Sequence, residues 1–214
     1  MKLRFAPTSP YVRKCLVVAH EVGLAGEVAL EPTNPWEADT TIAADNPLGK
    51  VPALITDDGL SLFDSRVICE YLDSHSQSPH LFPSGGDRWR VLRLAAIGEG
   101  ILDAADTRIM ESRRKPAKID YAWDTRKKTA IIRALNELER LASAFSGIDI
   151  GLITIGCALG ELDFRFPEED WRAVRPKLSG WYADFAQRPS MSETVTVHWE
   201  DWIGMNGATG STRS

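Results

Sequence analysis

Cysteine is scarce in this sequence of 214 residues, which contains three: Cys15, Cys69 and Cys157. They show neither CxxC spacing nor the spacing of metal ligands, so the sequence predicts no metal site. Each falls on an apolar helical stripe, where a free thiol behaves as a small hydrophobic side chain. We therefore expect buried core cysteines in a reducing, cytoplasmic protein.

Long apolar runs and an excess of basic charge are also missing. The longest apolar stretch, residues 150–160, is too short and too rich in glycine to cross a membrane. The N-terminus runs into strand and helix without a signal peptide. The net charge of −5 argues against a nucleic-acid binder, which would show a concentrated basic face. The short basic runs at 113–115 and 126–128 are interpreted as solvated faces, so neither membranes nor nucleic acids are expected partners.

Strand signals are confined to the first part of the chain. With 43% hydrophobic and 26% charged residues, the sequence is that of a globular protein able to bury a core. Apolar runs bounded by turn residues predict strands over 3–5, 28–30, 53–56 and 61–63. Helical periodicity predicts a helix from about Pro10 to Gly23 and a short or irregular one over 36–45. It predicts a third from about Asp64, with Val67, Ile68, Tyr71 and Leu72 on its apolar face.

Beyond Gly86 only helical periodicity remains. It predicts helices over 88–112, 122–145, 150–163 and 169–187. The segment before it, rich in serine, proline and glycine, is the natural linker. We therefore expect an α/β domain over 1–76, a linker over 77–86, an all-α domain over 87–203 and a polar tail over 204–214.

The first predicted helix starts with a distinctive turn. Pro10 suits the first helical position, and Ser9 before it is a favoured N-cap. The free N–H groups and the positive end of the helix dipole therefore point at whatever lies beside Ser9. A hydroxyl at that point can donate to an anion, including a thiolate, although Ser9 as a plain cap is the simpler interpretation.

Two further turns carry groups that suit a peptide ligand. Pro52 stands at the entrance to a strand, and a cis bond there would turn the backbone of Val51 outward, toward an extended ligand. At the next helix start, Asp64 and Ser65 can accept from an ammonium group and donate to a carboxylate.

These motifs together resemble the cytosolic glutathione S-transferase family, most closely its bacterial serine-type members. The similarity covers nearly the whole chain and depends on residues 9–14 (SPYVRK), 46–54 (NPLGKVPAL) and 64–72 (DSRVICEYL). It implies a thioredoxin-like α/β N-terminal domain followed by an all-α C-terminal domain. It also implies a homodimer.

The resemblance assigns a role to each glutathione-binding position. Val51, which precedes the cis proline Pro52, would hold the cysteinyl backbone of glutathione. Asp64 and Ser65 would bind its γ-glutamyl group, and Lys50 would meet its glycyl carboxylate.

The resemblance places a hydroxyl beside the glutathione sulfur, and two residues compete for the position. Ser9 is favoured over Thr8, because Ser9 stands where related thiol transferases carry the first cysteine of a CPYC motif. Here the motif reads SPYV, with both cysteines absent, which argues against dithiol redox chemistry. A free thiol titrates near pH ~8.5. A hydroxyl donor at a helix N-terminus would therefore act by stabilising the thiolate for attack on a small electrophile.

The second substrate is poorly determined by sequence. Tyr11, Asp106 and Met110 are candidate walls of its pocket, although each fits a surface or core role equally well. Trp199 and Trp202 lie in a C-terminal extension that either folds back toward the site or packs at a surface. In the second domain, Asp149 is the expected N-cap of a core helix whose glycines weaken it, so packing must hold it.

The leading hypothesis is a detoxifying glutathione transferase of alkyl or aryl groups, with glutathione as its co-substrate. Two alternatives stay open. One is a non-enzymatic interaction or stress module on the same scaffold. The other is a glutathione-dependent isomerase or peroxidase.

Overall fold

The chain divides into two units in a computed structural model that describes residues 1–76 and 80–206. One unit holds Met1–His80 together with the segment from Thr194 onward, and the other holds Leu81–Glu193. The expected helical domain over 87–203 therefore needs correction at its end. The segment from Thr194 joins the first unit because its backbone and aromatic side chains contact the first strand and the turn after it.

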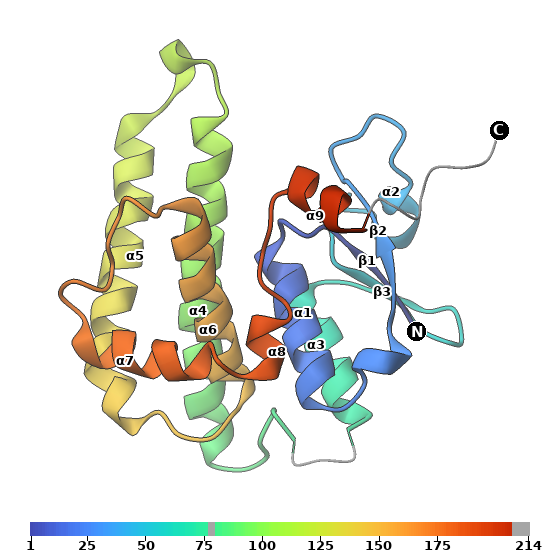
Figure 1. Cartoon of the computed structure of the whole chain (residues 1–214), viewed down its shortest axis with the longest axis horizontal. Coiled ribbons are helices and arrows are strands. Elements are labelled where there is room, and N and C mark those ends of the chain that lie inside the picture. Colours follow the sequence, from blue (N-terminus) through green and yellow to red (C-terminus); the bar gives the residue numbers. More distant parts are fainter. Residues whose placement is uncertain (77–79, 207–214) are drawn as a thin grey trace. The chain divides into compact units, whose positions relative to one another are not determined.

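The first unit is built on a four-stranded sheet in the order β2-β1-β3-β4. Strand β1 runs parallel to β2 and antiparallel to β3, which is antiparallel to β4. Helix α1 connects β1 to β2 and packs beside α3 (Figure 1). This is a thioredoxin-like fold, as expected. The elements are β1 Lys2–Phe5, α1 Pro10–Glu21, η1 Ala25–Glu27, β2 Ala29–Pro32, α2 Ile42–Asp45, β3 Ala53–Ile55, β4 Ser61–Leu62 and α3 Ser65–Ser74.

One local expectation in this unit is narrowed and another is wrong. The short or irregular helix predicted over 36–45 is confined to α2, because the side chain of Asn34 accepts a hydrogen bond from the Trp36 amide at 3.0 Å and starts a turn there. Val67, predicted on the apolar face of α3, is 47% exposed. That face is made by Ile68, Cys69 and Leu72, which are fully buried. Leu72 follows Ile68 by four positions and Cys69 by three, so the three side chains lie on one side of the helix.

All three cysteines are buried and stay outside disulfide bonds, as the apolar stripes predicted. Cys15 on α1 and Cys69 on α3 touch, with their sulfur atoms 4.0 Å apart. Cys157 lies in the second unit, in the helix at its centre. The two cysteines of the first unit thus fill the α1–α3 interface as small hydrophobic side chains.

The second unit is all-helical among its described residues, as expected. Helices α4 and α5 lie side by side, and α6 packs along α4 (Figure 1). The predicted helix over 169–187 starts only at Pro176, because proline suits a first helical turn and the residues before it form turns. The elements are α4 Asp87–Ser112, η2 Pro116–Lys118, α5 Tyr121–Leu141, η3 Ala142–Ala144, α6 Ile150–Arg165, α7 Pro176–Phe185 and α8 Pro189–Ser192.

Helix α6 forms the centre of this unit. Every residue from Ile150 to Leu162 is buried, and Asp149 caps the helix by accepting from the Leu152 amide at 2.9 Å, as predicted. A Cβ on Gly98 of α4 would lie only 2.9 Å from the backbone carbon of Thr154. The missing side chain therefore lets the two helix backbones approach closely, and this packing holds a helix of weak intrinsic propensity.

We predict opposite effects of alanine at two glycines of α4. Gly98→Ala should lower the free energy of unfolding by about 1–3 kcal/mol, because the new methyl group meets backbone that cannot move aside. Gly100→Ala has no atom within 4 Å of the new Cβ and should raise that free energy by about 0.5–1 kcal/mol. Urea unfolding followed by tryptophan fluorescence measures both changes. Equal effects of the two substitutions would refute the close approach.

Candidate functional site

Strand pairing brings three chain segments to one end of the sheet. Arg4 at the end of β1 pairs with Ala53 at the start of β3, and Leu54 pairs with Leu62 at the end of β4. In antiparallel pairs the end of one strand faces the start of its neighbour. The turn after β1, the residues before β3 and the residues after β4 therefore share an edge, and these segments carry the three motifs singled out in the sequence.

Ser9 is the N-cap of α1. Its Oγ accepts from the Val12 amide at 3.3 Å, and its carbonyl accepts from the Arg13 amide at 3.0 Å. A serine hydroxyl that accepts one hydrogen bond keeps its proton for donation to a second group. Capping and contact with an anion are therefore compatible in Ser9. The half-buried Thr8 stands just outside the cap.

The second segment is held by a buried asparagine. Asn46 is 3% exposed, and its Nδ2 donates to the carbonyl of Lys50 at 2.7 Å while its Oδ1 accepts from the Leu48 amide at 3.0 Å. The side chain of Lys50 is exposed, and the Val51–Pro52 peptide bond is cis, as the motif suggested. The loop before β3 thus has a backbone fixed by Asn46 and a cation at its surface.

The third segment is the start of α3. Asp64 caps this helix, with Oδ1 accepting from the Arg66 amide at 2.9 Å and from the Ser65 hydroxyl at 3.3 Å. Asp64 is exposed, whereas Ser65 is 2% exposed and its carbonyl accepts from the Cys15 thiol at 3.8 Å. The Asp64 carboxylate therefore lies at the surface. It is held by the adjacent Ser65, whose backbone is bonded to α1.

The C-terminal segment returns to the same end of the sheet, a feature that the sequence left open. The Val197 amide donates to the carbonyl of Pro7 at 3.2 Å. In α9, Trp199–Asn206, the ring of Trp202 packs edge-on against Phe5 at 5.4 Å and lies 5.9 Å from the ring of Trp199. The tryptophans therefore border the turn that leads to Ser9. The tail expected over 204–214 is helical up to 206, and its remainder lies outside the described residues.

The expected electrophile residues fall in different units. Tyr11 is half-buried in the first turn of α1. Asp106 is exposed and Met110 half-buried, four residues apart on α4 and thus on one face of that helix. Their joint role in a substrate pocket stays a prediction.

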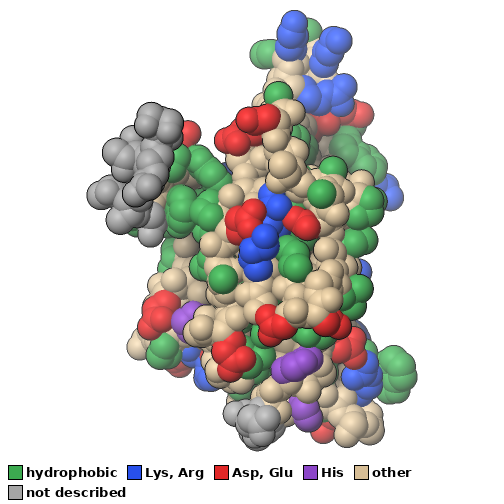
Figure 2. Space-filling model, turned by 90° about the vertical axis from the view of Figure 1, so that its right-hand side faces the viewer, with side chains coloured by type: hydrophobic (Ala, Val, Ile, Leu, Met, Phe, Trp, Pro, Cys, Tyr) green, Lys and Arg blue, Asp and Glu red, His purple; other side chains and the backbone are tan. Residues whose placement is uncertain are grey.

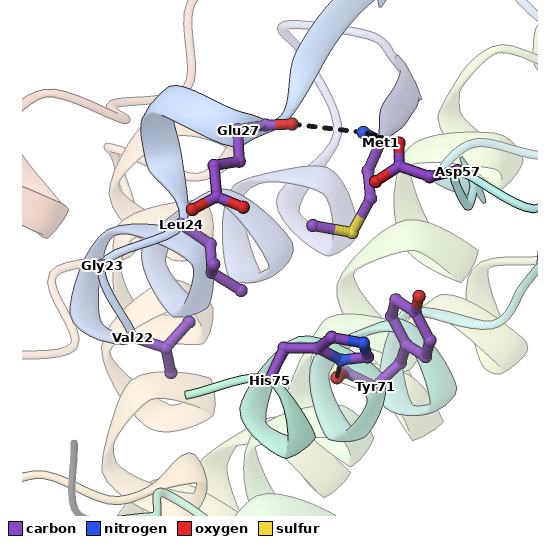
Figure 3. A pocket seen from close by; sticks show the side chains of 8 residues that line it. All are labelled: Met1, Val22, Gly23, Leu24, Glu27, Asp57, Tyr71 and His75. Atoms are coloured by element: carbon purple, nitrogen blue, oxygen red, sulfur yellow. Dashed lines mark hydrogen bonds and ion pairs between the residues drawn. The ribbon is translucent and has the colours of Figure 1, made fainter. Parts of the chain in front are cut away.

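A cavity of about 420 Å³ lies at the opposite end of the sheet (Figure 3). It opens where β1 begins and where the β3–β4 turn starts. Its lining is Met1, Val22, Gly23, Leu24, Glu27, Asp57, Tyr71 and His75. None of the three motifs contributes to it, so the cavity is separate from the candidate site.

Charges on the sheet are balanced by close partners. Lys2 and Glu31 form an exposed ion pair at 2.7 Å, and the hydrogen bond from Lys2 is the main reason that the pKa of Glu31 lies below its usual value. In the middle of the face shown in Figure 2, basic side chains lie between acidic ones. Residues 1–76 and 80–206 contain no cluster of three or more acidic, histidine or cysteine side chains fit to hold a metal. They also contain no helix with the length and apolarity to span a bilayer.

Comparison with known proteins identifies relatives over most of the chain. Residues 8–75 match the family model "Glutathione S-transferase, N-terminal domain". The chain is 33% identical to the "Uncharacterized GST-like protein YibF" of Escherichia coli (strain K12), over 91% of this chain and 98% of that protein. The family-model match covers the helix starts and the loop that carry the candidate site.

Solved structures extend the similarity to both units. A glutathione transferase family member from Pseudomonas fluorescens Pf-5 with bound glutathione is 43% identical, with a TM-score of 0.88 and coverage of 92% of this chain and 99% of that chain. A glutathione S-transferase from Methylobacillus flagellatus KT with GSH bound is 35% identical, with a TM-score of 0.87 and the same coverage.

Burial of the cysteines predicts their reactivity. The sulfur-bearing side chains are all 0% exposed, so the folded protein should react only slowly with a thiol reagent, whereas all three thiols should react at once in denaturant. Spectrophotometric thiol titration measures both rates. A rapidly reacting thiol in the folded protein would contradict the burial of the cysteine that carries it.

Proposed function

This chain belongs to the glutathione S-transferase family, and on that premise we propose that it binds glutathione and transfers it to a small electrophile. The observation that carries the proposal is the convergence of three motifs at one end of the sheet. These motifs are the N-cap of α1, the loop whose backbone is held by Asn46 and which carries the exposed Lys50, and the capped start of α3. We further propose a cytoplasmic homodimer of the bacterial serine type, on the resemblance of the motifs.

Glutathione would lie extended along this edge. The exposed carboxylate of Asp64 suits the γ-glutamyl ammonium group, and Ser65 at the α3 N-terminus suits the γ-glutamyl carboxylate. The backbone of Val51, before Pro52, would pair with the cysteinyl residue. The ammonium group of Lys50 would meet the glycyl carboxylate.

The chemistry would depend on Ser9 and the N-terminus of α1. Lowering the pKa of the bound thiol by about two units requires about 2.7 kcal/mol of preference for the thiolate. A hydrogen bond from a hydroxyl to a charged acceptor contributes ~1.5–3 kcal/mol, and the helix dipole adds to it. The thiol would lose its proton to solvent, and the sulfur lone pair would form a bond to the electrophilic carbon. With an aryl halide, the carbon–halogen bond would break and the halide would leave with the bonding electrons, while Ser9 keeps its proton and forms no covalent bond.

The residues proposed to bind the electrophile come from both units. Tyr11 follows Ser9 by two positions in the first turn of α1, and Asp106 with Met110 lies on one face of α4. We retain these three side chains as the proposed substrate-binding residues. Thr8 remains the competitor of Ser9 for the sulfur.

Calorimetric titration with glutathione tests the binding site. Wild-type protein should release saturable heat, and Asp64→Asn should weaken binding about tenfold, because it removes the charge that meets the ammonium group. Asparagine caps helices as well as aspartate does, so α3 should keep its stability. Asp57→Asn, at the opposite end of the sheet, is the matched control and should bind like the wild type. No heat up to millimolar glutathione would favour an interaction module without enzymatic function.

Turnover of a test aryl halide distinguishes the two hydroxyls. Ser9→Ala should lower kcat about 100-fold through loss of the donor to the thiolate. Thr8→Ala should stay within about twofold, because Thr8 lies outside the cap. In Ser9→Ala the pKa of the enzyme-bound thiol, followed by its thiolate absorbance, should rise toward that of free glutathione. A large loss of turnover in Thr8→Ala with normal turnover in Ser9→Ala would assign the sulfur contact to Thr8. Normal turnover in both variants would refute a catalytic role for either hydroxyl.

A further inference from the structure

A buried arginine on β1 joins the sheet to the segment that leads into the candidate site. Arg4 is 7% exposed. Its Nε donates to Thr33 Oγ1 at 2.8 Å and lies 3.3 Å from Glu31 Oε1. Its Nη2 donates to Thr41 Oγ1 at 2.9 Å, and its Nη1 donates to Asp45 Oδ2 at 2.6 Å. The guanidinium therefore spans from β2 to both ends of α2.

Helix α2 depends on this arginine for its position. It has four residues, and a helix of one turn is not stable by itself. Thr41 stands at its N-cap, but its side chain makes no capping hydrogen bond and is held by Arg4 instead. Asp45, the last residue of α2, is held by the same guanidinium.

The next residue connects this helix to the loop of the site. The Asn46 amide donates to the carbonyl of Ile42 in α2, and the Asn46 side chain bridges the carbonyl of Lys50 and the amide of Leu48. A displacement of α2 is thereby transmitted to Lys50, whose carbonyl the Asn46 side chain holds. The connection consists of hydrogen bonds of 2.6–3.0 Å from Arg4 to Lys50.

We propose that Arg4 and Asp45 are positioning residues that set the affinity of this protein for the glycyl end of glutathione. The inference rests on the function proposed above. Neither side chain would touch the ligand. Their partly buried ion pair fixes α2, and α2 together with Asn46 fixes the loop. The loop in turn presents Lys50 to the glycyl carboxylate. A planar guanidinium suits this task because it bonds several acceptors in a fixed geometry.

The test compares glutathione with γ-glutamylcysteine, which lacks the glycyl residue. For wild-type protein, the dissociation constant of γ-glutamylcysteine divided by that of glutathione measures the contribution of the glycyl contact to binding. Arg4→Met should weaken glutathione binding about fivefold, the loss expected for one exposed ion pair of about 1 kcal/mol. It should leave γ-glutamylcysteine within about twofold, so the ratio falls toward one. The value of kcat at saturating glutathione should not change, since Ser9 is untouched.

Three further variants make the test specific. Lys2→Met removes a cation that lies on the same strand face and pairs with the same Glu31, so binding of both ligands should be unchanged. Asp45→Asn keeps the shape of Asp45 and should lower the ratio even if Arg4→Met fails to fold. Arg4→Met and Lys50→Met should be non-additive, because both remove the same glycyl contact.

Each outcome bears on one of the two proposals. Equal weakening of both ligands in Arg4→Met and Asp45→Asn, or no change in either, would overturn the positioning role while leaving glutathione binding intact. Additive losses in the double variant would also overturn it. Failure of wild-type protein to bind either ligand would instead remove the proposed function itself.

Discussion

Strand β3 is three residues long, and its antiparallel pairing on both sides is the constraint on which the candidate site depends. The pairing brings the turn after β1, the loop before β3 and the start of α3 to one edge. The turn after β1 precedes the other two segments by dozens of residues, whereas the loop before β3 and the start of α3 are about a dozen residues apart. Each strand is too short to be stable alone, so the buried α1–α3 layer, including the Cys15–Cys69 contact, holds the pairing in register.

Several of the residues proposed to bind glutathione also start helices. Ser9 caps α1, and Asp64 caps α3. A helix N-terminus combines free amide donors with a positive dipole end, so a polar side chain placed there serves folding and anion binding together. Substitutions at these positions therefore affect stability and binding at once. Asp64→Asn preserves the cap of α3. Ser9→Ala removes the hydrogen bond from the Val12 amide, so the pKa of the bound thiol is the measurement that separates its effect on chemistry from its effect on folding.

Much of this architecture was predictable because its determinants are local. Proline at a first turn, a capping side chain before it and apolar spacing of three or four residues predicted α1, α3, α4 and α6 with small errors at their ends. The fold class was predicted correctly through the resemblance to glutathione S-transferases. Other errors arose where packing between elements, and not the local sequence pattern, decided which side chains are buried. Val67 fits an apolar stripe by composition, but the face that packs on α1 is centred on Cys69, so Val67 points to solvent.

The sequence by itself determined the starts of α1, α3, α4 and α6, the change from mixed to purely helical structure along the chain, and the motif residues, because each depends on neighbours within a few positions. Only the tertiary structure decided the return of Trp202 to Phe5 and the role of Arg4. A buried guanidinium must find acceptors wherever folding brings them, and those of Arg4 lie 29 to 41 positions away. No periodicity or local propensity encodes such partners. They follow from strand pairing and from the need to satisfy a charge removed from water.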